Sequence, residues 1–220
     1  ALQWIVEQGN PLGLSVAWSD AVYWIPVTDE INLMDIQVFL SGWILQLDCL
    51  SVLDLKAQLD FISGHKRTAI QDCAVAAYLL NPLKDSYESD DIARDYLDRV
   101  VPSYKELFGK QSFVQAMEAD PVRFKNYACY QAWTCYQVQS VLEAHLKETG
   151  MHELFWNIEM PLVYALYDME QAGIEVNQSA LKEYGNKLGV QITACQEKIY
   201  KAVGREFNIN SPKQLGEILF

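Results

Sequence analysis

Residues 1–27 read ALQWIVEQGNPLGLSVAWSDAVYWIPV, and this stretch decides the fold class. It contains three runs rich in aliphatic and aromatic side chains, at 1–6, 12–18 and 21–27. Gly9-Asn10-Pro11 separates the first two runs, and Ser19-Asp20 separates the last two. Runs of this kind, bounded by turn-forming residues, are typical of short strands. The stretch therefore predicts an antiparallel meander of three strands.

Helical spacing governs most of the remaining chain. Apolar residues recur every three or four positions over 33–45, 54–61 and 70–80, and a short strand is expected over 49–52. Pro121 suits the first turn of a long helix that runs to about Leu146. Strands followed by helices indicate an α/β domain with a mixed sheet.

Only helices are expected beyond Thr149-Gly150. The sequence therefore predicts one domain over 1–150 and a separate helical region over 151–220. The helix boundaries in that region are marked by residues suited to left-handed ends and to N-caps: Gly173, Asn177 or Ser179, Gly204 and Ser211-Pro212. Because the chain opens on Ala1 and closes on Phe220 within a helical pattern, both ends are expected to be cuts through a longer protein.

The charge of the chain bears on its partners. It holds 29 acidic and 17 basic residues, a formal net charge of -12. Proteins that grip nucleic acid usually present a basic face, because neutralising phosphates supplies most of the affinity. The balance predicts weak or no DNA binding by this chain alone, and it argues against a free-standing nucleic-acid-binding module.

The cysteines and histidines show no metal-binding pattern. Five scattered cysteines and three histidines give no zinc-type spacing. Dispersed cysteines in odd number, with no signal-peptide pattern, predict a cytoplasmic protein. No apolar run approaches the roughly 18 residues that a membrane span needs, so no membrane association is expected.

Three motifs in the last 70 residues carry a specific resemblance. They are Glu159-Met-Pro-Leu-Val163, Met169-Glu-Gln-Ala-Gly-Ile-Glu-Val176 and Phe207-Asn-Ile-Asn-Ser-Pro-Lys-Gln-Leu215. In this order and spacing they resemble the opening of the polymerase domain of bacterial family A DNA polymerases. The two palm aspartates and the fingers helix of that family come after the point where this chain stops.

The upstream part resembles the 3′–5′ exonuclease domain of the same polymerases. The matching pieces include Leu12-Gly-Leu-Ser-Val16, Tyr23-Trp-Ile-Pro-Val27 and Ala77-Tyr-Leu-Leu-Asn-Pro82. The resemblance implies a ribonuclease H-like fold for this part. It also implies a site in which four carboxylates hold two divalent metal ions that activate water.

This chain departs from the family at each metal-binding position that can be compared. The family carries Asp-x-Glu on its first strand, yet residues 1–6 contain no acid and Glu7 lies at or beyond the strand end. Gln58 stands where a helix supplies an Asp, and Gln131 stands where Tyr-x-x-x-Asp ends, although its Tyr127 is kept. A neutral amide cannot replace a carboxylate in holding two dications close together. We expect no nuclease catalysis and no metal site.

Several acids and bases leave alternatives open. Asp72 is expected to cap a helix, with metal ligation as the alternative. The acidic stretch 85–98 is expected to be a solvated helix start, with a new metal cluster as the alternative. His65-Lys66-Arg67 is expected to be a solvated loop, with a phosphate contact as the alternative. An active metal-dependent proofreading exonuclease remains the competing function.

The resemblance also implies a contact with primer-template DNA. Asn208, Asn210, Ser211 and Lys213 match positions where the family approaches the duplex. The alternative is that Asn210 and Ser211 only cap the last helix. The expected role of the chain is architectural. It would be a structural platform within a DNA-directed DNA polymerase, needing no cofactor itself, whereas the parent enzyme needs Mg²⁺ and contacts DNA and the rest of its own chain.

Overall fold

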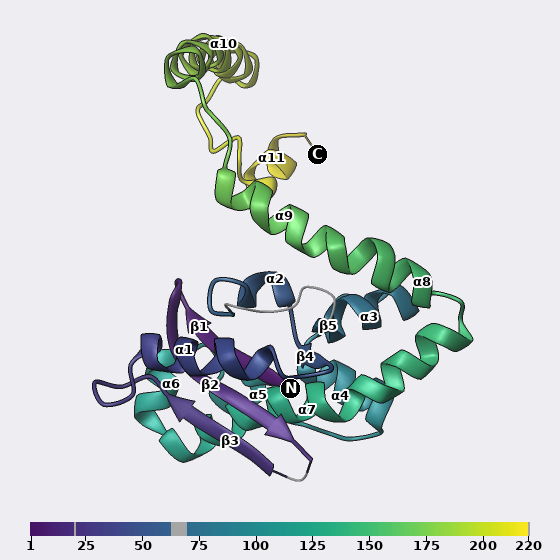
Figure 1. The fold of residues 1–220 in the computed structure, drawn as a ribbon. Helices are drawn as coiled ribbons and strands as arrows, with labels where there is room; N and C mark the ends of the chain where they lie inside the picture. The colour runs from purple at the N-terminus through teal and green to yellow at the C-terminus, as the bar shows by residue number, and fades with distance from the viewer. Residues whose placement is uncertain (20, 63–69, 220) are drawn as a thin grey trace. The chain divides into compact units, whose positions relative to one another are not determined.

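The computed structural model describes residues 1–19, 21–62 and 70–219, and it divides into two compact units, Ala1–Ala172 and Gly173–Phe220 (Figure 1). The first unit contains the strands β1 (Leu2–Glu7), β2 (Asn10–Trp18), β3 (Ala21–Pro26), β4 (Leu50–Val52) and β5 (Ile70–Asp72). Its helices are α1 (Leu33–Ile44), α2 (Leu55–Gln58), α3 (Cys73–Leu80), α4 (Ser89–Leu97), α5 (Tyr104–Phe108), α6 (Phe113–Ala119), α7 (Pro121–Glu148), α8 (His152–Leu154), the π-helix η2 (Phe155–Glu159) and α9 (Met160–Ala172).

The predicted meander is confirmed. Strand β2 pairs antiparallel with both β1 and β3, in registers that place Leu2 opposite Val16 and Trp18 opposite Ala21. Gly13 on β2 lies under the ring of Trp24, and a Cβ at this position would come within 2.5 Å of that ring. The close approach therefore requires glycine.

The predicted mixed sheet is divided into two sheets in the structure. Strands β4 and β5 pair parallel with each other, apart from the β1–β3 sheet. The expected helix over 70–80 begins only at Cys73, because Ile70–Asp72 forms β5. That strand depends on pairing with Leu50–Val52, about twenty positions away, a partner that local periodicity does not reveal.

Helices cover both faces of the meander (Figure 1). On one face, Leu14 and Val16 share a core with Ile36 and Leu40 of α1. On the other face, α7 packs against all three strands, and Ile5 joins a second, aromatic core with residues of α5, α6 and α7. The long helix α7 runs from Pro121 as predicted. Helix α6 was not predicted from the sequence.

The segment after the turn at Gly150 packs within the first unit. Lys56 of α2 donates to Glu170 of α9 at 2.6 Å, and Tyr167 donates to Asp60 at 2.6 Å. The first compact unit therefore ends at Ala172. The boundary between functional domains expected near residue 150 stays a prediction.

The second unit consists of α10 (Gln178–Val203) and α11 (Pro212–Leu219). Asn177 accepts from Ala180 N as the N-cap of α10, and Gly204 ends that helix with a φ of 79°. Gly173 also adopts a positive φ, as predicted. Neither helix of this unit has a buried residue within the described part.

Two sequence features lie outside the described residues. They are the basic cluster His65-Lys66-Arg67 and Asp20 of the β2–β3 turn. Among the helices that are described, none combines the length and the apolar character that crossing a bilayer requires.

Candidate functional site

The structure brings Gln58, Tyr127 and Gln131 to one cavity of about 380 Å³ beside β1. Gln58 comes from α2, whereas Tyr127 and Gln131 lie one helical turn apart on α7. Backbone pairing and helix packing thus join three positions that are far apart in the sequence. The cavity is therefore lined by all three residues that were predicted from the sequence to be degenerate exonuclease positions.

Gln58 is fixed to the first strand by its side-chain amide. Its Oε1 accepts from Trp4 N at 2.7 Å, and its Nε2 donates to Trp4 O at 3.4 Å. Gln58 is buried. It contacts the edge of β1 opposite the one that pairs with β2. An ionised carboxylate has no donor, so it could satisfy Trp4 N but not Trp4 O.

A second glutamine makes a matching bridge that sequence reasoning missed. Gln3 Oε1 accepts from Leu53 N at 2.9 Å, just after β4. Gln3 is buried although it is polar, and a lone polar residue within the apolar run 1–6 is the signal that could have identified it. Together Gln3 and Gln58 tie β1 to the segment around α2.

Asp72 performs the capping role predicted for it. Its carboxylate accepts from Ala74 N at 2.9 Å and Val75 N at 3.3 Å at the start of α3. It also accepts from Leu55 N at 2.6 Å and Asp54 N at 3.2 Å. Burial raises the pKa of Asp72 to about 6, and the hydrogen bonds from Leu55, Val75 and Ala74 oppose that shift. Among the described residues, the donors to this carboxylate are backbone N–H groups, so its geometry is that of a cap.

Tyr127 and Gln131 line the cavity without hydrogen-bond partners among the described residues. Gln131 is 5 % exposed and Tyr127 is 8 % exposed. Tyr127 belongs to an aromatic cluster, with its ring 5.2 Å from that of Tyr104. Burial, followed by the charge of Glu88, raises the pKa of Tyr127, so the phenol stays protonated at neutral pH.

Two carboxylates that were not predicted as site residues, Asp54 and Glu88, also line this cavity. Asp54 has a φ of 54°, a left-handed conformation that Asp tolerates better than most residues, and Glu88 occupies the N-cap position of α4 without making a side-chain cap. Within the described ranges, no group of three or more His, Cys, Asp or Glu side chains could hold a metal ion. Two acids and three amides, the third being that of Gln3, do not fit the two-metal site that the resemblance implies.

The acidic stretch 85–98 spans the loop before α4 and the whole of that helix, and it places Asp90 and Asp91 in the first turn, as expected of an acidic helix start. Asp91 pairs with Arg94, and Asp95 pairs with Lys84. These pairs neutralise part of the negative charge near the cavity.

A larger hollow of about 860 Å³ lies between α1 and the strands β2 and β3. Of its described lining residues, Asp35 alone carries charge, and its carboxylate accepts from Asn32 at the start of α1. The hollow is therefore apolar and supplies few groups for chemistry.

The residues predicted to contact nucleic acid gather at the loop before α11. Asn208 Oδ1 accepts from Asn210 N at 3.1 Å, and Ser211 Oγ accepts from Gln214 N at 3.4 Å. Asn208, Asn210 and Lys213 are exposed. The cap expected at Ser211 is present, and the side chains of Asn210 and Lys213 have no hydrogen-bond partner among the described residues.

The sequence is similar to known polymerases. No family model matches it. It is 35% identical to DNA polymerase I of Bacillus subtilis over 149 residues, which cover 68% of this chain and 17% of the relative. It is 29% identical to DNA polymerase I of Streptococcus pneumoniae over 214 residues, which cover 96% of this chain and 24% of that relative. The chain thus spans less than a quarter of the length of these curated relatives.

A solved structure shares the fold. It is described as the POL domain of Pol1 from M. smegmatis in complex with DNA primer-template and dNTP. The match has a TM-score of 0.71 and 23% identity, and it covers 100% of this chain and 36% of that chain. Sequence and fold together place the chain in the class of bacterial DNA polymerases. The family is that of DNA polymerase I, to which the chain is related over most of its length, and the resemblance predicted from the motifs is confirmed.

Proposed function

We propose that this chain is part of a DNA-directed DNA polymerase in which a vestigial 3′–5′ exonuclease domain no longer cuts DNA and serves as a structural platform. The vestigial domain would occupy 1–150 and have a ribonuclease H-like fold. Residues 151–220 would form the first helices of the polymerase domain. DNA replication and repair synthesis would be carried out by the parent enzyme.

The observation that carries the proposal is the pair of hydrogen bonds between Gln58 and Trp4. At a position where the family places a metal-binding carboxylate, this chain uses an amide to close the edge of β1. The substitution therefore converts a ligand position into a buried structural bridge. Gln131, at the second such position, is likewise neutral.

The proposal assigns DNA contact to the parent enzyme. Asn208, Asn210, Ser211 and Lys213 would approach the primer-template duplex, since backbone N–H groups at a helix start with a nearby Lys suit a phosphate. The net charge of -12 supports weak or no binding by the isolated chain. Mg²⁺ would serve the polymerase centre of the parent, and this part would need no cofactor.

A nuclease assay tests the proposal. The 220-residue chain is incubated with a labelled single-stranded oligonucleotide and millimolar Mg²⁺ or Mn²⁺, with a chelator-treated sample as the blank. We expect no shortening from the 3′ end. Metal-dependent trimming would establish the competing function, an active proofreading exonuclease.

A Gln58→Asp, Gln131→Asp double variant sharpens the assay. We expect it to be inactive as well, because Glu7, the one carboxylate of β1, lies outside the cavity lining and accepts from Phe113 N and Val114 N at the start of α6. Recovery of activity in the double variant alone would show that two restored acids suffice. The cavity would then be a site disabled by substitution at these two positions.

A further inference from the structure

Two adjoining cavities meet beside Gln131. The cavity of about 380 Å³ next to β1 and one of about 460 Å³ next to α5 share Glu88, Phe113, Tyr127 and Gln131 as walls. Each volume lies within the range of about 300–1,000 Å³ that is typical of small-ligand sites. The pair, here called the Gln131 pocket, is large enough for a small organic ligand.

The Gln131 pocket holds unused hydrogen-bonding capacity. Gln131 and Tyr127 are 5 % and 8 % exposed as whole residues, and neither side chain has a hydrogen-bond partner in the described part of the chain. Leaving a buried polar group unpaired costs about 1–3 kcal/mol. A ligand that offers N–H donors would satisfy Gln131 Oε1 and the phenolic oxygen together.

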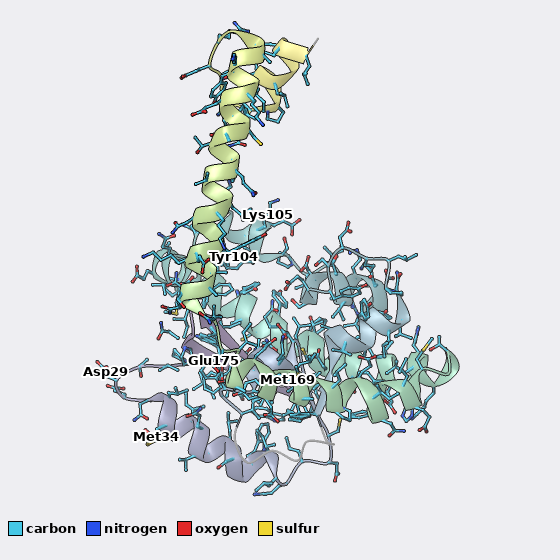
Figure 2. The ribbon with its side chains drawn as sticks, turned by 90° about the horizontal axis from the view of Figure 1, so that it is seen from above. Asp29, Met34, Tyr104, Lys105, Met169 and Glu175 are labelled. Atoms are coloured by element: carbon cyan, nitrogen blue, oxygen red, sulfur yellow. The ribbon has the colours of Figure 1, made fainter. Side chains whose placement is uncertain are left out.

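The charge at the walls of the Gln131 pocket is negative. Asp54, Glu88 and Asp90 line it, and none of the three carboxylates forms an ion pair among the described residues. Partial burial of its carboxylate, followed by the charges of Asp90, Asp54 and Asp91, raises the pKa of Glu88, although the residue as a whole is exposed. Lys105 on α5 is the one basic residue among the described walls, and it follows Tyr104 directly (Figure 2).

Aromatic rings form the remaining wall. Tyr104 meets Phe113 edge-on at a centroid distance of 4.8 Å and meets Tyr127 at 5.2 Å. Ring faces attract ammonium and guanidinium groups, more strongly where water is excluded. The same rings would also accept a flat nucleobase, so charge has to decide between the two kinds of ligand.

We propose that the Gln131 pocket binds an organic cation, an ammonium or guanidinium group on a short aliphatic stem. The inference rests on the proposed loss of the metal ligands. Without metal ions, the unpaired carboxylates repel a nucleotide phosphate and attract a cation. The N–H groups of the cation would reach Gln131 and Glu88, and its stem would lie along Tyr104 and Phe113.

Such a cation has two sources, a free aliphatic amine or guanidine, or a basic side chain of a protein. Agmatine represents the first source and N-acetyl-arginine amide the second. N-acetyl-citrulline amide is the matched neutral control, because it keeps the shape and most donors of the arginine compound but lacks the charge. Each compound is titrated into the 220-residue chain by calorimetry, with Tyr and Trp fluorescence as a second readout.

We expect at least one of the two cations to bind about tenfold or more tightly than the citrulline compound. Agmatine alone would indicate a small-molecule site, and the arginine compound alone would indicate a protein partner. Glu88→Gln should weaken cation binding about five- to tenfold, and Gln131→Leu should weaken it similarly. Glu118→Gln, an exposed acid on α6 outside the pocket, is the control and should change nothing.

Three results would overturn the inference. They are equal binding of the neutral compound, tighter binding of thymidine monophosphate than of either cation, and an unchanged affinity in Glu88→Gln. If Gln131→Leu fails to fold by circular dichroism, Glu88→Gln decides, because that side chain is exposed. Metal-dependent nuclease activity would instead refute the proposed function, so the two failures are distinguishable.

Discussion

Gln58 satisfies both backbone polar groups of Trp4, accepting from its N–H at 2.7 Å and donating to its carbonyl at 3.4 Å. The two residues are 54 positions apart, and both are buried. The side-chain amide here takes the place of a neighbouring strand, because it carries both a donor and an acceptor, as a peptide group does. The edge of β1 is thereby closed by a residue that stands where the resemblance predicts a metal-binding carboxylate.

Gln58→Glu tests this bridge. The variant keeps the length of the side chain but loses the donor to Trp4 O and places a charge in a buried site. We expect the free energy of unfolding at pH 7 to fall by about 2–4 kcal/mol. Denaturant titration measures the change. Gln46→Glu makes the same substitution at an exposed glutamine and serves as the control. It should change the free energy of unfolding by less than about 0.5 kcal/mol. Equal effects at both positions would contradict the structural role of Gln58.

Asp72→Asn probes the buried cap through pH. The folded state raises the pKa of Asp72 from 3.8 to about 6, so between these values the folded protein binds more protons than the unfolded chain. Stability contributed by this group is therefore highest below about pH 4 and falls as pH rises towards 6. The stability of the natural chain minus that of Asp72→Asn should fall by up to about 3 kcal/mol over this window and stay level above it. Denaturation of both proteins at pH 4, 5, 6 and 7 tests this, and a difference that rises with pH would refute it.

Glu143→Gln should show the opposite pH dependence. Burial tends to raise the pKa of Glu143, but hydrogen bonds from Lys147, Trp156 and His152 outweigh it, so the pKa is lowered from 4.5. The stability that Glu143 contributes is present above about pH 4.5 and is lost as pH falls further. Glu143→Gln should cost about 1 kcal/mol at pH 7, because the side chain is only partly buried, and less at pH 3.5.

The exposed Glu148 near the end of α7 provides the control for Glu143. Glu148→Gln should leave the free energy of unfolding unchanged within about 0.5 kcal/mol at both pH values. If the free energies of unfolding of the two variants change with pH in the same way, the contacts of Glu143 with Lys147, Trp156 and His152 do not contribute to stability.

Glu7→Gln tests a contact between β1 and α6. The Glu7 carboxylate accepts from Phe113 N at 2.6 Å and from Val114 N at 3.4 Å, at the start of α6. A negative charge at a helix N-terminus is favourable, so the neutral amide should cost about 1 kcal/mol of unfolding free energy. Glu118→Gln, at the other end of the same helix, should cost nothing or stabilise slightly. Hydrogen exchange should also quicken at Phe113 in the Glu7 variant.

Local chemistry allowed much of the fold to be predicted. Pro121 marks the first turn of α7, and Gly173 and Gly204 adopt the left-handed conformation expected of helix ends. Ser211 caps α11. These signals can be recognised in the sequence because each depends on the backbone preferences of one residue and its near neighbours.

Pairing between distant segments was not predictable in the same way. Ile70–Asp72 has apolar spacing that suits a helix, yet it forms β5 because Leu50–Val52 lies alongside it. Helix α6 is short, and its start is held by Glu7, more than a hundred positions away. Neither outcome is encoded in the periodicity of the segment itself.

The sequence by itself determined that Gln58 and Gln131 are amides, and so neutral where the resemblance predicts carboxylates. Only the tertiary structure decided what the two amides do. Gln58 meets both backbone polar groups of Trp4, whereas Gln131 faces a cavity and has no hydrogen-bond partner among the residues that the structure describes. The reason is physical, because a residue type fixes charge and hydrogen-bonding capacity, but the partners that use this capacity come from segments that only folding brings together.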